Sequence, residues 1–254
     1  SPEEILDIAV KKNIGLLSIT DHDILEGSME LLGLNKYSNI KCISGVELDA
    51  VNSGINFHIL GYGVDLTNEN FGSFVRKNRE LLENVNIKLI GKIQKDYPKI
   101  TLVDYENFEY EKNKGGWKAL HYFIEKGLTK NLLEGLMLYT KYENSYTCIK
   151  FPTIEKVCRE IHNAGGKAIF AHPGKIIKNN IITEFTEELN KVISMGVDGI
   201  ECYYPSHSRE VTAACLEVCR KNNLLITCGS DCHGKFLDTK IGELPITIDE
   251  IDIG

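Results

Sequence analysis

The chain has 254 residues, of which 43% are hydrophobic and 26% charged, which is ordinary for a soluble globular protein of one large α/β domain or two small ones. The formal net charge of −7 argues against an electrostatic grip on long nucleic acid, but not against a phosphorylated substrate, because bound divalent metals can supply positive charge locally. No stretch of 18 or more apolar residues is present, so we expect no membrane span.

The first part of the chain alternates between helical and extended patterns. Ser1-Pro2-Glu3-Glu4 combines a capping box with proline at the first helical position and predicts the start of a helix. The elements expected next are a buried strand at 15–19, a helix at 24–34, a strand at 41–48, a hairpin turn at 51–55 and a strand ending near Gly63.

Residues 67–150 break this alternation. A long helical pattern covers 68–95, and two shorter ones follow between turn-rich stretches such as Tyr97-Pro98 and Gly115-Gly116. We interpret 67–150 as an inserted helical domain that divides an α/β domain into 1–66 and 151–254.

Alternation returns after the insertion. The predicted helices are 153–164, 182–195 and 207–222, and the predicted strands are 167–171, 197–202, 224–228 and 241–246. Alternating strands and helices predict parallel strands with helices outside. About seven strands, one of them upstream of Ser1, favour a barrel over an open sheet. In both, catalytic groups lie at the C-terminal ends of strands.

The eight cysteines do not form a pattern that predicts disulfides or a zinc ribbon. Cys215 and Cys219 share a helical face, Cys158, Cys202 and Cys228 lie in apolar runs, and no CxxC pair occurs. We therefore expect reduced, buried thiols and a cytoplasmic protein.

Imidazole and carboxylate side chains gather in or just beyond the predicted strands. They are His22 within Thr20-Asp21-His22-Asp23, Glu47, His58, His172 before Pro173-Gly174-Lys175, Glu201 with the nearby His207, and Asp231 and His233 within Ser230-Asp231-Cys232-His233-Gly234. Neutral imidazole and carboxylate together suit Zn, Mn or Fe. An extended chain at 231–233 would point Asp231 and His233 to the same side. A glutamate such as Glu47 can bridge two metals, which together activate a shared water.

Each of these motifs also has a structural interpretation. The turn at 20–23 can cap a helix, His172-Pro173-Gly174 can be a simple turn, Ser230 can be an N-cap, Glu47 a surface charge and His58 a core histidine. His121 and His162 lie within helical patterns, and we expect both to be structural. The repeated placement at strand ends favours one shared metal site.

With these motifs in order, the chain resembles the PHP family, the polymerase and histidinol phosphatase domain. The resemblance rests on elements spread over nearly the whole chain, namely 19–23, 45–47, 58–62, 171–175, 199–208 and 229–234. It implies a distorted seven-stranded (β/α)7 barrel with an inserted helical domain and two or three divalent ions, usually Mn, Fe or Zn. The family's opening His-x-His motif, and the Asp that follows it, would lie just before Ser1.

The resemblance also implies a metal ligand set. Glu47 would bridge two metals, His58 and His172 would complete one of them, and Asp231 would bind the other.

A third metal would be held by His22 and His233. Lys175 and His207 would contact the substrate phosphate, and His207 would also serve as acid for the leaving group. In the insertion, Gly115 to His121 replaces a Gly-Arg-x-x-His-like element of related enzymes.

The function implied is metal-dependent hydrolysis of phosphate monoesters or short 5′-phosphorylated nucleotides through a metal-bridging hydroxide, with Glu47, Asp231 and His207 as catalytic residues. The closest pattern within the family is that of phosphoesterases acting on nucleoside 3′,5′-bisphosphates and short oligonucleotides. Two alternatives stay open. One is a metal-dependent amidohydrolase, which usually bridges its metals with a carboxylated lysine, and the other is a degenerate barrel that binds metal without turnover. Natural substrate and oligomeric state are not predicted.

Overall fold

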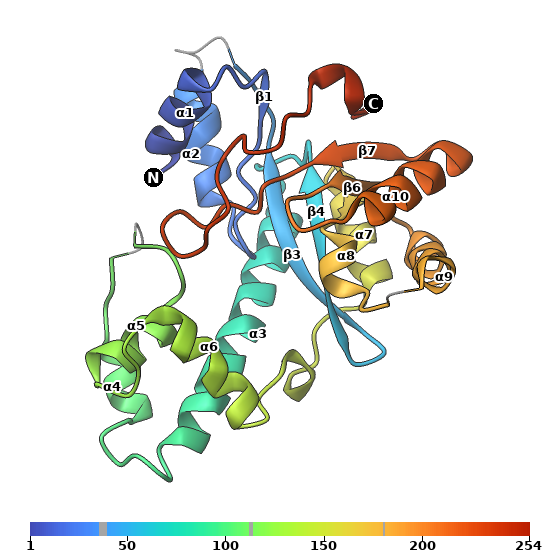
Figure 1. Cartoon of the computed structure of the whole chain (residues 1–254). Coiled ribbons are helices and arrows are strands. Elements are labelled where there is room, and N and C mark those ends of the chain that lie inside the picture. The colour runs from blue at the N-terminus through green and yellow to red at the C-terminus, as the bar shows by residue number, and fades with distance from the viewer. Residues whose placement is uncertain (36–39, 112–113, 180) are drawn as a thin grey trace.

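The strands form two sheets in this computed structural model, which describes residues 1–254 except 36–39, 112–113 and 180 (Figure 1). The larger sheet has the order β3-β4-β5-β6-β7, with β3 at Gly45–Asn52, β4 at Ile55–Tyr62, β5 at Lys167–Phe170, β6 at Gly199–Tyr203 and β7 at Leu225–Cys228. The smaller sheet pairs β1 (Leu16–Leu17) with β2 (Lys41–Cys42) in parallel. Within the described ranges, the two sheets do not close into a seven-stranded barrel.

Strand direction is mixed, so the prediction of parallel pairing is correct only in part. β5, β6 and β7 are parallel neighbours, as expected. β3 and β4 form the predicted hairpin, and its two turn residues Ser53 and Gly54 both have positive φ, which matches the right-handed twist of the strands. β4 and β5 are also antiparallel, because the long connection between Tyr62 and Lys167 allows β5 to return against β4.

Two predicted strands differ from the structure. The strand expected at 41–48 is divided, because β2 ends at Cys42 and joins the smaller sheet, while β3 starts at Gly45, where Ser28 Oγ accepts the Gly45 N–H. The strand expected at 241–246 is absent. Gly242 has φ 62° and Pro245 has no N–H, so this stretch cannot extend a ladder. Asp252 instead forms an antiparallel bridge to Ile226.

Ten α-helices are assigned in the described part of the chain. They are α1 (Pro2–Lys11), α2 (Glu26–Asn35), α3 (Glu69–Ile93), α4 (Leu102–Asn107), α5 (Lys118–Glu125), α6 (Leu132–Lys141), α7 (Ile154–Asn163), α8 (Pro173–Ile176), α9 (Ile182–Ile193) and α10 (Arg209–Asn222). α1 begins with the predicted capping box at Ser1. No helix of the described ranges combines the length and apolarity that a bilayer crossing requires.

The apolar side chains form separate cores. The main core lies between the larger sheet and helices α7, α9 and α10, with Leu48, Ile59 and Phe170 fully buried in it. A second core lies within α3 to α6 and includes Leu89, Tyr122 and Phe123. Figure 1 shows α3 extending away from the sheets and α4 to α6 gathered beside its far part. All eight cysteines are free thiols.

Candidate metal centre

Three buried side chains from neighbouring strands meet at one point, and we call them the strand cluster: Glu47, His58 and His172. Glu47 Oε1 lies 2.8 Å from His58 Nδ1 and 3.1 Å from His172 Nε2. The two imidazole nitrogens His58 Nδ1 and His172 Nε2 are 3.1 Å apart. Glu47 lies on β3, His58 lies on the antiparallel β4, and His172 follows β5. The sheet register therefore brings the three donors together, although Glu47 lies near the start of β3 and His58 in the middle of β4, and not at strand ends as expected.

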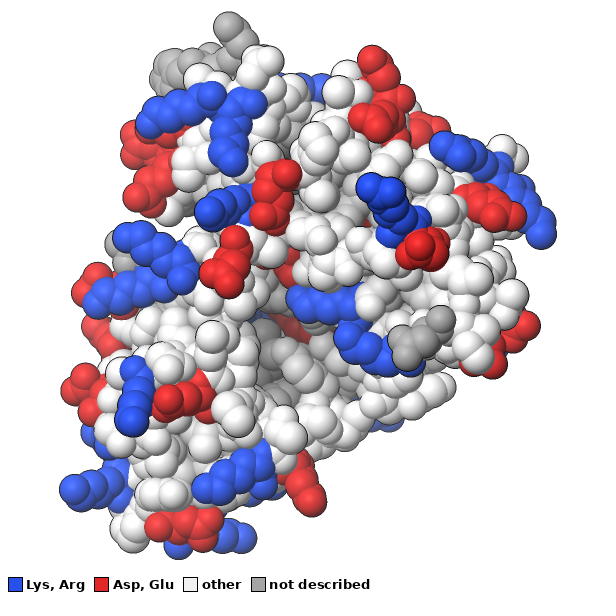
Figure 2. Space-filling model, viewed as in Figure 1, with Lys and Arg blue, Asp and Glu red and all other residues white. Residues whose placement is uncertain are grey.

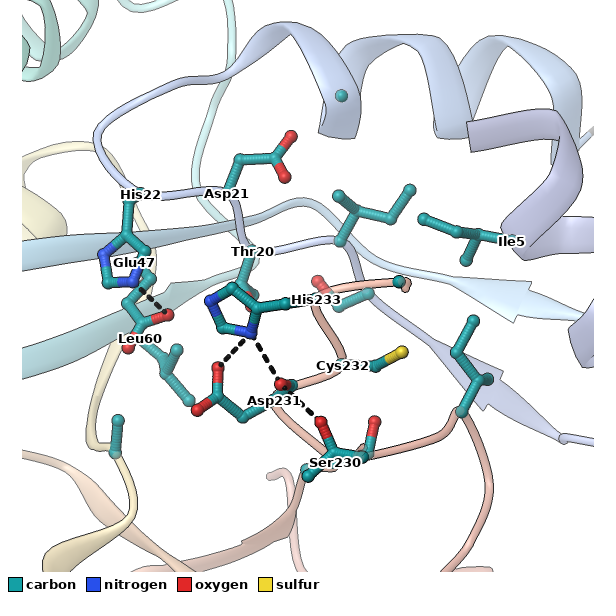
Figure 3. A pocket seen from close by; sticks show the side chains of 18 of the residues that line it. Ile5, Thr20, Asp21, His22, Glu47, Leu60, Ser230, Asp231, Cys232 and His233 are labelled. Atoms are coloured by element: carbon teal, nitrogen blue, oxygen red, sulfur yellow. Dashed lines mark hydrogen bonds and ion pairs between the residues drawn. The ribbon is translucent and has the colours of Figure 1, made fainter. Parts of the chain in front are cut away.

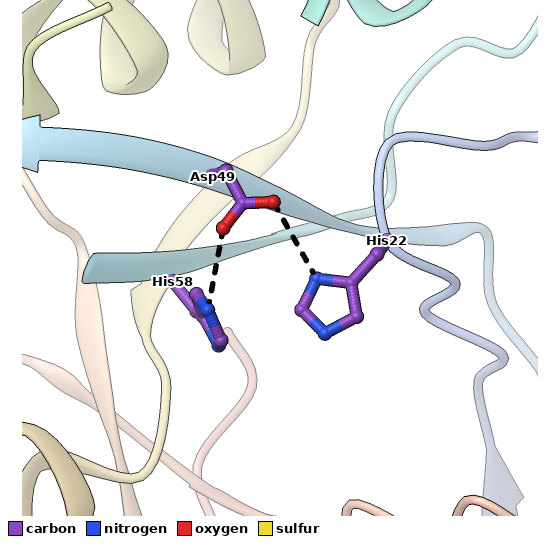
Figure 4. Close-up of side chains that lie close together, drawn as sticks. All are labelled: His22, Asp49 and His58. Atoms are coloured by element: carbon purple, nitrogen blue, oxygen red, sulfur yellow. Dashed lines mark ion pairs between the residues drawn. The ribbon is translucent and has the colours of Figure 1, made fainter. Parts of the chain in front are cut away.

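A second group joins the strand cluster through His58. Asp49 lies directly opposite His58 in the β3–β4 ladder, with Asp49 Oδ1 3.3 Å from His58 Nε2. On its other side, Asp49 Oδ2 lies 3.8 Å from His22 Nδ1, as Figure 4 shows. His22 reaches this position through a bridge to Glu47, and its Nε2 lies 3.6 Å from Glu47 Oε2. The sequence analysis missed Asp49, although strand alternation puts it on the same face as Glu47.

The charges of this group are set by mutual contact. Burial acts to raise the pKa of Glu47, but the charges of His22 and His58 and hydrogen bonds from His172 and His58 lower it well below its usual range. Burial acts to lower the pKa of His58, but Glu47 and Asp49 raise it to about 10. Burial lowers the pKa of His172. Without a metal, the proton shared by these groups therefore resides on His58.

Asp231 and His233, which we call the loop pair, lie in the loop after β7 (Figure 3). Asp231 has φ 47°, so the expectation of an extended chain here is wrong. The two side chains nevertheless face one another, with His233 Nδ1 3.4 Å from Asp231 Oδ1. The rings of His233 and His22 are 6.2 Å apart, which brings the loop pair beside the first group.

The remaining carboxylate oxygen of Asp231 is already engaged. Asp231 Oδ2 lies 2.8 Å from Lys175 Nζ and accepts a hydrogen bond from the Tyr204 hydroxyl at 3.0 Å. Burial acts to raise the pKa of Asp231, as does the charge of Glu47, but the hydrogen bond and charge of Lys175 together with the charge of His233 lower it. Lys175 thus holds a candidate metal ligand, and its contact with a substrate phosphate stays a prediction.

His207 is close to the site, but its ring is held by backbone groups. Its Nδ1 lies 3.0 Å from the carbonyl oxygen of Cys202, and its Nε2 accepts the N–H of Gly174 at 3.1 Å. Nδ1 is therefore the protonated nitrogen, and Nε2 must release Gly174 before it can meet a substrate. Its role in acid catalysis or phosphate binding stays a prediction.

The residues present fit a divalent cation. Two sets of donor atoms lie within 4.8 Å of one another, namely Glu47, His58 and His172, and His22, Asp49 and His58. His22 Nδ1 and Asp49 Oδ2 are buried and make no hydrogen bond in the structure. Buried polar atoms of this kind are costly unless something binds them. A mixed imidazole and carboxylate set suits Zn, Mn or Fe, as the sequence predicted.

Three of these donors, His22, Glu47 and His172, border an open cavity of about 2460 Å³. One wall carries Glu47, His172, Glu201, Asp231 and His233. Residues 67–150 also line this cavity, with the cation Arg79 and the aromatic residues Tyr110, Trp117, Tyr139 and Tyr146. A substrate of nucleotide size therefore has room to reach the donors.

Comparison with known proteins gives a consistent result. No family model matches the chain. It is 25% identical to the phosphoribosyl 1,2-cyclic phosphate 1,2-diphosphodiesterase of Eggerthella lenta, over 92% of this chain and 88% of that protein. It is also 25% identical to the 5′-3′ exoribonuclease Rnm of Escherichia coli (92% and 80% covered) and 22% identical to the 3′,5′-nucleoside bisphosphate phosphatase of Chromobacterium violaceum (92% and 82% covered). The predicted resemblance to PHP-family phosphoesterases is confirmed. With it, the prediction of a phosphoester hydrolase is confirmed.

Solved structures agree on the fold. A Bifidobacterium adolescentis structure assigned as a metal-dependent phosphoesterase has a TM-score of 0.78 at 22% identity and covers 98% of this chain and 88% of that chain. An amidohydrolase structure from Chromobacterium violaceum has a TM-score of 0.74 at 20% identity, with 95% and 86% covered. The mixed α/β fold of this chain is therefore shared along nearly its whole length.

Proposed function

We propose that the chain hydrolyses phosphate monoesters of small substrates at a centre of two or three divalent ions (Mn, Fe or Zn). The observation that supports this most is the strand cluster, in which three buried donors converge within 2.8–3.1 Å beside an open cavity. His58 and His172 would bind one ion, Glu47 would bridge it to a second ion bound by Asp231, and His22 and His233 would hold a third. Bound divalent ions would supply the Lewis acidity and positive charge that phosphoryl transfer needs.

The protein's own residues prepare the site for that charge. The lowered pKa of Glu47 keeps it ionised at neutral pH. Lys175 has a half-exposed side chain, and its Nζ lies 2.8 Å from Asp231 Oδ2. We propose that the ammonium group of Lys175 contacts the substrate phosphate and transfers from Asp231 as the substrate arrives.

We propose that the substrate is a nucleotide or a short 5′-phosphorylated oligonucleotide, which the cavity of about 2460 Å³ has room to hold. We propose that residues 67–150 form an inserted domain over the site whose aromatic side chains receive the planar base. This segment contacts the loop pair region directly, because the Trp117 ring lies 6.0 Å from that of Phe236. Figure 2 shows Lys and Arg side chains near the central hollow of this face, although the whole chain is acidic. Positive charge near a cavity favours small anionic substrates.

Phosphate ester hydrolysis is preferred to amide hydrolysis on one observation. A metal-dependent amidohydrolase of the kind considered above uses a carboxylated lysine to bridge its metals. Within the described residues, the ion-pair partners of Glu47 and Asp49 are histidines and not lysines, and Lys175 is paired with Asp231 instead. An aryl amide should therefore not be hydrolysed under conditions in which an aryl phosphate is.

The test is hydrolysis of an aryl phosphate by the purified chain with added Mn²⁺. Glu47→Gln keeps the shape of the side chain but removes its negative charge, and should lower kcat/KM at least about 100-fold. Glu210→Gln, an exposed position on α10, is the matched control and should have no effect. An unchanged rate in Glu47→Gln would contradict the proposal. One tightly held ion per chain without turnover would support a degenerate barrel instead.

A further inference from the structure

Glu201 is a buried carboxylate beside the candidate metal centre that neither candidate metal group includes. It lies on β6, is 4% exposed and borders the cavity. Within the described residues it has no salt bridge, and its hydrogen bond comes from the backbone N–H of His172, 2.9 Å from Glu201 Oε2. A buried carboxylate is costly unless its contacts offset the loss of water. Its position therefore calls for an explanation.

The first explanation lies in the conformation of His172. This residue has φ 33° and ψ 56°, in the left-handed region, and it precedes Pro173. A non-glycine residue is disfavoured there, and the residue before a proline is further restricted. Such a conformation persists only where neighbours over-determine it. The carboxylate of Glu201 supplies that support on the N–H side, and the Lys175 N–H donates to the His172 carbonyl at 2.8 Å on the other.

The other carboxylate oxygen of Glu201, Oε1, lies against the loop that follows β7. A Cβ added to Gly229 would be 1.9 Å from Glu201 Oε1, so a larger residue at position 229 would displace the carboxylate from its present position. Gly229 directly follows β7, and its N–H donates to the Tyr203 carbonyl at 3.1 Å. Asp231 lies two residues further along the same loop. One side chain thus touches the backbone that carries His172 and the backbone that leads to Asp231.

We propose that Glu201 is a positioning residue whose carboxylate fixes His172 and the loop after β7, so that donors from both strands are aligned for a divalent cation. The alignment of metal ligands in this inference rests on the proposed function, whereas the contacts of Glu201 do not depend on it. Glu201 acts through the backbone of its neighbours and is not itself a ligand.

The test compares Glu201→Ala with Glu201→Gln. The alanine variant removes the acceptor of the His172 N–H, while glutamine keeps an acceptor oxygen but cannot ionise. In metal-free protein, amide hydrogen exchange at His172 should accelerate at least about tenfold in Glu201→Ala and stay near wild type in Glu201→Gln. Mn²⁺ affinity, measured by calorimetry, should fall about 10–100-fold in Glu201→Ala and less than about threefold in Glu201→Gln.

Asp198→Ala is the matched control. Asp198 Oδ2 accepts the N–H of Ala168 at 2.8 Å, which is the same type of contact at the other end of β5. This variant should accelerate exchange at Ala168 and leave Mn²⁺ affinity within about twofold, because it is remote from the donors. A general weakening of the fold would instead affect the two alanine variants alike.

Gly229→Ala tests the second contact, because its methyl group must displace the carboxylate. It should weaken Mn²⁺ binding as Glu201→Ala does. The double variant, with Glu201→Ala and Gly229→Ala combined, should bind Mn²⁺ no more weakly than Glu201→Ala alone. An unchanged rate of amide exchange at His172 in Glu201→Ala would overturn the inference. A loss of Mn²⁺ affinity in Glu201→Gln as large as that in Glu201→Ala would also overturn it, because Glu201 would then be a ligand. If wild type binds no Mn²⁺, the proposed function fails, while the exchange measurement still decides the role of Glu201.

Discussion

The strand cluster and the loop pair belong to one candidate site but are held in different ways. Glu47 and His58 lie within β3 and β4, and His172 directly follows β5, so the hydrogen-bond register of the sheet fixes their spacing. Asp231 and His233 lie in a loop, and His233 has a side chain 26% exposed. The position of Asp231 depends on Lys175 and Tyr204, which come from two other segments.

This difference separates a preorganised half of the site from an adaptable one. The donors of the strand cluster already face one another at a spacing that a single cation can satisfy, so little rearrangement is needed. Asp231 must exchange the ammonium of Lys175 for a cation before it can act as a ligand. We therefore expect the strand cluster to dominate metal affinity and the loop pair to tune it.

The largest expected effect comes from comparing a histidine-to-glutamine substitution in the strand cluster with one in the loop pair. His58→Gln should weaken the tightest Mn²⁺ site at least about 100-fold, because it removes a buried donor that other residues cannot replace. His233→Gln should weaken Mn²⁺ binding only about tenfold, because its loop can adjust. Calorimetric titration of both variants provides the measurement. Equal losses would remove the distinction between the halves.

A second expectation concerns pH and is specific to the strand cluster. The pKa of His58 is raised from 6.5 to about 10, so protonated His58 stabilises the metal-free fold fully below about pH 6.5, and this contribution is lost as the pH rises through about 10. A cation requires the neutral ring and must displace that proton. Mn²⁺ affinity should therefore rise by up to about tenfold per pH unit between about pH 6.5 and 8.5. The rise in Mn²⁺ affinity per pH unit should be smaller in His58→Gln. An equal rise in wild type and His58→Gln would exclude His58 as the group that the metal deprotonates.

The smallest expected effect concerns the loop pair. Lys175→Met keeps the length of the side chain but frees Asp231 from its cationic partner. Binding of a second Mn²⁺ should tighten about threefold, because the half-exposed Lys175 contributes only a modest attraction that the cation no longer has to replace. The KM for an aryl phosphate should rise about tenfold in the same variant, because the proposed phosphate contact is lost. The Kd of the second Mn²⁺ should thus fall while the KM for the aryl phosphate rises. If both constants fell or both rose, the proposed exchange of Lys175 between Asp231 and substrate would be contradicted.

Several elements could be predicted from local patterns. Proline and the capping box at Ser1 predict α1, and the strand-end positions of His22, Glu47, His58 and His172 predict a shared site. Asp49 was missed because an acidic residue in mid-strand has no local signature of ligation. Glu201 was noted at a strand end, but its contact with the His172 N–H depends on the register between β5 and β6, which no single segment specifies.

What the sequence by itself determined is the kind of chemistry, because a mixed set of imidazoles and carboxylates in and after apolar strands specifies the class of metal that suits them. Only the tertiary structure decided which atoms meet. The antiparallel return of β5 against β4, the left-handed turn at His172 and the pairing of Asp231 with Lys175 all depend on contacts between segments far apart in the chain. The local residue pattern limits the conformation of each segment, whereas the positions of the segments relative to one another are set by the packing of all of them together.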